Sequence, residues 1–221
     1  MSLVLLISQS NGLTFGNIGP APYTPTARVQ IWLPEAQTFA PMTPGLNTGS
    51  PIHPTAWGPE VSFANAWLEA NPSGTLYLGK VSKGSTPIAD WLPSTDLFDQ
   101  ALLTANRMKF VLDRPLDQVL MIHGETDAMA LETALAYGDN LAVLKAAFRA
   151  GLAQHDLPFI TSLINPTTPY ADELRLEQHL QALADPHSTS FDTSHLSTYD
   201  GLHLDPPSVI ALGELFFDNL F

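Results

Sequence analysis

Ser10 follows a short run of aliphatic residues and is well placed in the sequence to act as a nucleophile. The run, residues 3–7, is too short for a membrane span and predicts a parallel strand buried on both faces. Ligands of open α/β sheets bind at the carboxyl edge of such strands, so a polar turn after the strand would present the hydroxyl there. Serine is also common in ordinary polar loops, and this stretch alone leaves both interpretations open.

Asp200 and His203, three residues apart near the end of the chain, could make that hydroxyl reactive. A serine hydroxyl needs a base within hydrogen-bonding reach, and an imidazole base needs a carboxylate that orients it. In a turn leading into a helix, the Asp200 carboxylate could fold back onto one ring nitrogen and direct the other toward Ser10. Gly201 would ease the tight turn. A surface aspartate beside a surface histidine would show the same spacing.

Asp192 and His195 repeat this spacing a few residues earlier. Their segment lacks the glycine and does not lead directly into the last predicted helix. We therefore favour Asp200 and His203 as the pair that serves Ser10.

Acyl transfer through a serine also requires donors for the negative oxygen of a tetrahedral intermediate, commonly worth about 3 kcal/mol each. The backbone amides of Ser10 and Gly84 are the expected donors, because each follows a predicted buried strand. His123 could add a side-chain N–H, or it could be a core histidine bonded to a carbonyl. We also expect Gln9 and Glu125 close to the oxyanion and the substrate.

Glu125 and Asp127 belong to a second cluster of groups that could do chemistry. An ionised carboxylate aimed at an oxyanion would oppose catalysis, so we expect Glu125 to tie down its loop and Asp127 to cap the following helix. Alternatively, an extended backbone would place His123, Glu125 and Asp127 on one face, where they could bind a divalent ion for metal-dependent hydrolysis. That alternative leaves Ser10 without a role.

A third hypothesis is a non-catalytic glycan-binding module on the same fold. In that case the aromatic side chains around Trp57 and Trp91 would be the platforms on which a sugar ring stacks.

The elements that must position these residues alternate between strands and helices along the whole chain. Apolar runs and period-two alternation predict strands, and apolar residues at helical spacing predict helices. We expect strands at residues 3–7, 29–33, 75–81, 119–122, 159–164 and around Phe191. We expect helices at residues 60–70, 96–110, 170–184 and 208–221, and helical segments after residue 127, the clearest at residues 140–154. This alternation predicts an α/β fold in which helices cover both faces of a central parallel sheet.

Two segments carry more specific expectations. Residues 34–58 are rich in Pro, Thr, Gly and Asn, and we expect either an ordered loop near the substrate or a mobile surface excursion. In the helix at residues 170–184, we expect the leucines to lie on the buried side. They are Leu174, Leu176, Leu180 and Leu183.

Composition limits the classes of protein further. The 221 residues, 45% hydrophobic and 14% charged, are typical of a globular protein, and we expect one domain over residues 1–221. The absence of cysteine excludes disulfides and thiol catalysis. A net charge of −13 would repel phosphate backbones and anionic membranes, so we expect neither nucleic acid nor a membrane as partner.

The start of the chain lacks a basic leader and a small-residue cleavage site, so we interpret it as a strand and not as a signal peptide. A leader replaced or removed earlier would leave the same start, and localisation and oligomeric state stay open.

Five short motifs resemble those of SGNH (GDSL-like) hydrolases and occur in the same order as in that family. Together they span nearly the whole chain. The match is closest to the branch that contains sialate O-acetylesterases and the carbohydrate acetylesterases of carbohydrate esterase family 6. The motifs are Ser8-Gln9-Ser10-Asn11, Gly58-Pro59-Glu60 with Phe63-Ala64, Lys80-Val81 before Gly84-Ser85-Thr86 and Trp91, Gly124-Glu125-Thr126-Asp127, and Asp200-Gly201-Leu202-His203.

The resemblance implies a three-layer α/β/α sandwich of flavodoxin-like type and a serine esterase that removes acetyl groups from a carbohydrate without a cofactor. It implies Ser10 as nucleophile, His203 as base and Asp200 as orienting acid, with the Ser10 and Gly84 amides as oxyanion donors. Three positions depart from the family pattern: Ser8 replaces a glycine, His123 replaces a glutamine, and Gly84-Ser85 replaces paired glycines.

Overall fold

The computed structural model describes residues 1–13, 19–49 and 53–220 and contains a single seven-stranded sheet in the order β3-β2-β4-β1-β5-β6-β7. All neighbouring strands are parallel except β2 and β3. The strands are β1 (Ser2–Ser8), β2 (Val29–Leu33), β3 (Thr38–Pro41), β4 (Leu76–Ser82), β5 (Gln118–Ile122), β6 (Phe159–Ser162) and β7 (Ser188–Phe191).

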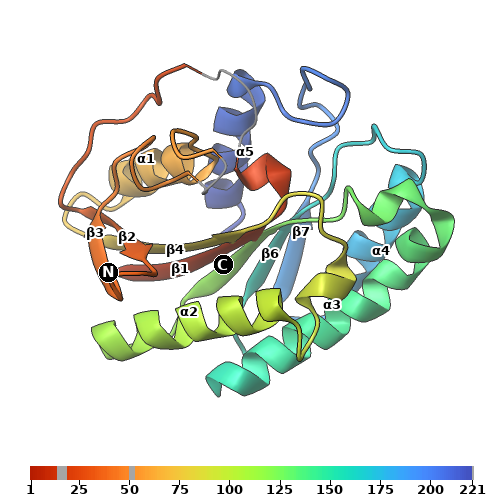
Figure 1. Cartoon of the computed structure of the whole chain (residues 1–221), viewed down its shortest axis with the longest axis horizontal. Coiled ribbons are helices and arrows are strands. Elements are labelled where there is room, and N and C mark those ends of the chain that lie inside the picture. Colours follow the sequence, from red (N-terminus) through yellow and green to blue (C-terminus); the bar gives the residue numbers. More distant parts are fainter. Residues whose placement is uncertain (14–18, 50–52, 221) are drawn as a thin grey trace.

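Helices cover both faces of this sheet, as Figure 1 shows. One face carries α1 and α5, and the other carries α2 and α3, with α4 beside α3. The helices are α1 (Glu60–Ala70), α2 (Asp96–Leu112), α3 (Leu131–Leu152), α4 (Ala171–Ala184) and α5 (Pro206–Asp218). The predicted α/β class, with a central sheet between two helical layers, is therefore confirmed.

Strand β1 contributes to both hydrophobic cores because successive side chains of a strand point to opposite faces. Leu3, Leu5 and Ile7 join the core under α2 and α3, whereas Val4 and Leu6 join the core under α1 and α5. All five are at most 3% exposed, which explains why the sequence of this strand is continuously apolar.

Three expectations about elements need correction. The segment at residues 34–58 contains a strand, β3, which pairs antiparallel with β2 after a turn in which Gln37 has a φ of 51°. The separate helical segments expected after residue 127 are mainly one continuous helix, α3, which begins at Leu131 and includes most of the clearest expected segment, residues 140–154. Of the four leucines expected on the buried side of α4, only Leu174 is buried, and the other buried residues of this helix are Ala171 and Gln178. The other three leucines, Leu176, Leu180 and Leu183, are exposed by 56%, 46% and 70%.

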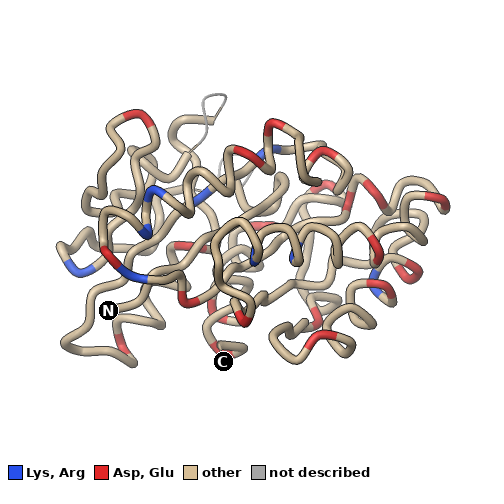
Figure 2. Tube along the Cα trace, turned by 90° about the horizontal axis from the view of Figure 1, so that it is seen from below, with Lys and Arg blue, Asp and Glu red and all other residues tan. Residues whose placement is uncertain are grey.

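Negative charge is spread widely over the molecule. Figure 2 shows acidic residues on many helices and loops, with fewer basic residues among them. In the described part of the chain, none of the helices combines the length and the apolar character needed to cross a membrane.

Candidate active site

The loops that follow β1, β4 and β5 leave the sheet at the same edge. In the parallel register, Ser8 lies opposite both Ser82 and Ile122, the last residues of the neighbouring strands. The side chains that follow these three residues are therefore gathered at the carboxyl edge of the central strands, where α/β folds bind ligands.

Ser10 begins a 3₁₀ turn, η1 (Ser10–Gly12), directly after this edge and is 8% exposed. The turn folds back so closely that a Cβ on Gly12 would lie 2.1 Å from Ser8 Oγ. Glycine is therefore required at position 12 for η1 to pack against the end of β1.

The structure brings Asp200 and His203 together. Asp200 Oδ2 lies 2.7 Å from His203 Nδ1, while Oδ1 accepts hydrogen bonds from the backbone amides of Leu202 and His203 at 2.9 and 2.7 Å. Partial burial raises the pKa of Asp200, but these hydrogen bonds outweigh burial and lower it to about 2. Gly201 has a φ of 86°, a conformation that favours glycine, so the tight turn expected between the two side chains is present.

The competing Asp192 is engaged elsewhere. Its carboxylate pairs with Arg175 at 2.5 Å and accepts hydrogen bonds from the Ser194 amide and hydroxyl at 3.0 and 2.6 Å. Among the described residues, no hydrogen bond or ion pair joins Asp192 to His195. The segment is therefore a local turn tied to α4.

Asn11 joins the two ends of the chain, a role that sequence reasoning missed. Its Oδ1 accepts a hydrogen bond from the Leu204 amide at 2.9 Å, and its Nδ2 donates to the Leu202 carbonyl at 3.3 Å and to Glu125 Oε1 at 2.7 Å. The side chain next to Ser10 thus holds the backbone on both sides of His203. An amide beside the serine was the only available signal.

Gln9 holds the three loops together from within. Its Oε1 accepts hydrogen bonds from the amides of Gly124 and Glu125 at 2.9 and 3.1 Å, and its Nε2 donates to the Thr86 carbonyl and to Thr126 Oγ1. The residue is 1% exposed, so its amide orders the loops after β4 and β5 around η1.

Gly84 lies half-buried in the turn after β4, which is fastened to β1 by a 3.0 Å hydrogen bond from the Lys83 amide to the Ser8 carbonyl. The next residue, Ser85, is exposed and has a φ of 59°. That left-handed conformation disfavours residues other than glycine by about 1 to 2 kcal/mol. Ser85 thus has the backbone conformation that suits a glycine, the residue found at this position in the paired glycines of the SGNH family pattern.

His123 is not brought to the accessible edge. The ring has no exposed surface, stacks on Tyr137 and meets Trp91 edge to face. Burial lowers the pKa of His123 to about 3, an effect partly offset by the Thr86 carbonyl. A ring placed in this way does not reach a substrate oxyanion. Of the two roles considered for His123, its position is that of a core histidine and not of an oxyanion donor.

Glu125 and Asp127 point to different partners. Glu125 Oε1 accepts the hydrogen bond from Asn11, as expected for a carboxylate that ties down its loop. Asp127 accepts hydrogen bonds from the Ile88 amide at 3.0 and 3.1 Å, so it caps the turn η2 (Ile88–Trp91) and not the helix after it. Burial raises the pKa of Asp127 to about 7, in opposition to the Ile88 hydrogen bond.

The residues named for the two alternative functions, metal-dependent hydrolysis and non-catalytic glycan binding, are not arranged as those functions need. Within residues 1–13, 19–49 and 53–220, no group of three or more His, Asp and Glu side chains is arranged to hold a metal ion. The backbone turns at Gly124, whose φ is 135°, so it is not the extended segment on which the metal-binding hypothesis depended. Trp57 and Trp91 are 2% and 0% exposed and therefore cannot stack against a sugar.

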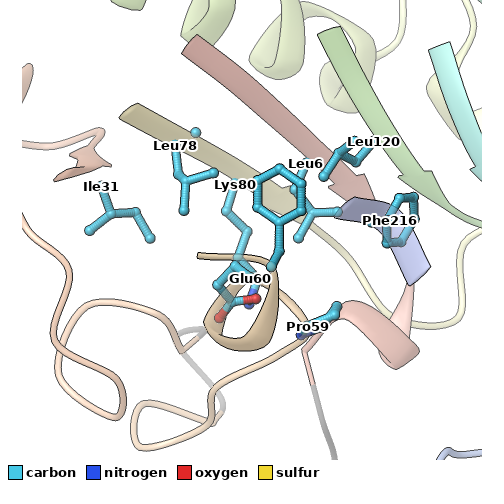
Figure 3. A pocket seen from close by; sticks show the side chains of 10 residues that line it. Leu6, Ile31, Pro59, Glu60, Leu78, Lys80, Leu120 and Phe216 are labelled. Carbon is cyan, nitrogen blue, oxygen red and sulfur yellow. The ribbon is translucent and has the colours of Figure 1, made fainter. Parts of the chain in front are cut away.

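A small cavity lies between the sheet and the helices α1 and α5, and Figure 3 shows the residues that line it. Its walls are mainly apolar, and it has room for about one water molecule. At one end, Lys80 Nζ bonds Glu60 Oε2 at 2.9 Å and the Thr48 carbonyl at 3.0 Å. This ion pair is almost fully buried and joins β4, α1 and the segment before α1, so the cavity is a feature of the core.

Comparisons with known proteins agree with this architecture. A relative from Arabidopsis thaliana named as a probable carbohydrate esterase is 25% identical over 195 residues, which cover 87% of this chain and 73% of the relative. A solved Arabidopsis thaliana structure superposes with a TM-score of 0.82 at 20% identity and covers 100% of this chain and 99% of its own.

Two more distant structures share the fold. The crystal structure of NanS has a TM-score of 0.77 at 13% identity, covering 99% of this chain and 96% of its own. An acetylxylan esterase from Geobacillus stearothermophilus has a TM-score of 0.62 at 12% identity, covering 99% and 94%.

Fold and family together define an enzyme class, the carboxylic ester hydrolases. The family model described as "Carbohydrate esterase, sialic acid-specific acetylesterase" matches residues 1–221, and the chain belongs to this family. The resemblance drawn from the sequence motifs is confirmed.

Proposed function

We propose that this protein is a serine esterase that removes O-acetyl groups from a carbohydrate, with Ser10 as nucleophile, His203 as base and Asp200 as the acid that orients His203. The observation that carries the proposal is the 2.7 Å hydrogen bond between Asp200 and His203, in a turn that Asn11 fastens to the turn of Ser10. Family membership supports acetylated sugars as the class of substrate.

The reaction proceeds in two halves. His203 Nε2 takes the proton of the Ser10 hydroxyl as Oγ attacks the acetyl carbonyl, and the tetrahedral oxyanion accepts hydrogen bonds from the Ser10 and Gly84 amides. The imidazolium then gives its proton to the leaving sugar oxygen as the ester bond breaks. Water, deprotonated by His203, attacks the acetyl-enzyme and releases acetate and the Ser10 hydroxyl.

Exchange of Ser10 for alanine tests the nucleophile. Ser10→Ala removes the attacking oxygen, so kcat for a small aryl acetate is expected to fall by about a thousandfold or more. Initial rates, with circular dichroism as a check on the fold, measure this effect. Turnover retained by a folded Ser10→Ala protein would defeat the proposal.

The two histidines with the same spacing supply a matched control. His203→Ala is expected to lose activity to a similar extent, whereas His195→Ala keeps it, because Asp192 is bound to Arg175. The reverse result would assign the base to the other pair.

A further inference from the structure

The Asn11 side chain makes three hydrogen bonds to other segments of the chain. Its carbonyl oxygen accepts one, and its amide nitrogen donates two. Two of its three hydrogen bonds go to the residues that flank His203, which lie more than 190 positions along the chain. The imidazole is therefore attached to the Ser10 turn through the backbone on both sides. An error of about 1 Å in such a placement can cost about a hundredfold in rate.

The third hydrogen bond of Asn11 ends on a buried carboxylate. Glu125 is 7% exposed, and its Oε2 has no hydrogen-bond partner among the described residues. Burial raises the pKa of Glu125, while the Asn11 hydrogen bond, the backbone amide and the charge of His203 oppose the rise. Asp200, the direct partner of the ring, has 39% of its side chain exposed, so solvent screens its charge more strongly.

We propose that Asn11 and Glu125 are positioning residues for His203. Asn11 fixes the backbone around the imidazole, and the Glu125 carboxylate orients Asn11 and favours the positive charge that the ring gains during the reaction. This inference rests on the proposed roles of Ser10 and His203.

The first test removes the charge and keeps the hydrogen bond. In Glu125→Gln the side-chain oxygen still accepts from Asn11, but the negative charge is gone. For an aryl acetate, kcat is expected to fall about tenfold with KM within about twofold, and the pH at which kcat/KM reaches half its plateau moves to lower values. A purely structural role would leave that pH midpoint unchanged.

Glu132→Gln is the matched control, since it makes the same change of charge at an exposed position in the first turn of α3. Its pH profile is expected to match that of the wild type. A Glu125→Gln enzyme with the wild-type kcat and pH midpoint would overturn the inference.

The second test exchanges donor and acceptor. Asn11→Asp sets a carboxylate against Glu125 and is expected to lower kcat about a hundredfold. Combining Asn11→Asp with Glu125→Gln lets the new amide donate to the new carboxylate, and about tenfold of the loss should return. A double variant no faster than Asn11→Asp alone would contradict the proposed pairing of Asn11 with Glu125. Thermal unfolding shows which variants are folded. If Asn11→Asp does not fold, the inference is tested by the pH midpoint of kcat/KM for Glu125→Gln alone.

Wild type and Ser10→Ala, measured on the same aryl acetate, separate the two proposals. Loss of turnover in Ser10→Ala with an unaltered Glu125→Gln enzyme defeats this inference alone. Retained turnover in Ser10→Ala defeats the proposed function, and the inference with it.

Discussion

The imidazole of His123 lies in contact with the rings of Trp91 and Tyr137 and has no exposed surface. Its Nε2 has no hydrogen-bond partner in the described part of the chain, and its Nδ1 is 3.3 Å from the Tyr137 hydroxyl. Protonation would place a charge where water does not reach, and this burial lowers the pKa of His123 to about 3 although Asp127 Oδ2 lies 3.9 Å from Nδ1. At this position the surroundings, and not the residue type, decide the chemistry.

A pH dependence of stability follows at the residue scale. The unfolded chain binds a proton at His123 below a pH of about 6.5, but the folded chain does not until about 3, so stability is lost as the pH falls through this window. Between pH 7 and pH 5, the free energy of unfolding should fall by about 2 kcal/mol more in the wild type than in His123→Gln. Urea unfolding at both pH values measures the difference.

Asp127 and Glu125 act in the opposite direction, because their raised pKa values let the folded chain bind protons more readily than the unfolded chain. Both carboxylates are present in the wild type and in His123→Gln, so the comparison reports on the histidine together with its interaction with Asp127, whose Oδ2 lies 3.9 Å from His123 Nδ1. Equal changes in the two proteins would contradict the assignment.

At the scale of elements, the packing of α5 against α1 supports the site. A Cβ on Gly213 would lie 2.1 Å from the Pro59 carbonyl oxygen and 2.8 Å from the Phe63 amide, so the two helices approach at backbone distance. Helix α5 is capped by Asp205, which accepts from the Ser208 amide at 3.0 Å directly after the turn of His203. The backbone on both sides of His203 is thus held by Asn11, and the chain that follows it is fixed by the capped start of α5.

Gly213→Ala is expected to lower the free energy of unfolding by about 1 to 3 kcal/mol because the backbone of α1 cannot move aside. Helix propensity alone would favour alanine by about 1 kcal/mol, so the sign of the change is informative. Gly138→Ala in α3 is the matched control, since its nearest neighbour is the mobile end of Glu177 at 2.3 Å. Chemical denaturation measures both, and a stabilised Gly213→Ala protein would contradict the close packing.

At the scale of the whole molecule, a net charge of −13 sets the field that a substrate meets. Acidic residues are distributed over many elements in Figure 2, so the field is not confined to one patch. An anionic acetylated sugar is therefore repelled on approach, whereas a neutral one is not.

Ionic strength should separate the two kinds of substrate. Raising salt from about 0.01 M to about 0.1 M shortens the Debye length from about 30 Å to about 10 Å. Accordingly, kcat/KM for an acetylated sialic acid is expected to rise about threefold, and kcat/KM for a neutral acetylated xyloside to stay constant. Steady-state kinetics at both salt concentrations measures this, and a fall for the anionic sugar would reveal a local positive site that dominates the overall charge.

The sequence by itself determined those features that depend on neighbouring residues. The aliphatic run of β1, the alternation of strands and helices, and the hydrogen bond of Asp200 to His203 all arise within a few positions, so periodicity and turn chemistry predicted them. The motifs also sufficed to predict the family.

The tertiary structure alone decided the features that depend on distant partners. The burial of His123, the outward direction of Leu176 in α4 and the bridge from Asn11 to Leu204 each depend on segments far away in the chain. Such contacts carry no local signal, because the same residue types serve equally well at the surface, in the core or at a site. Burial and long-range hydrogen bonding are set only when the sheet and its two helical layers come together.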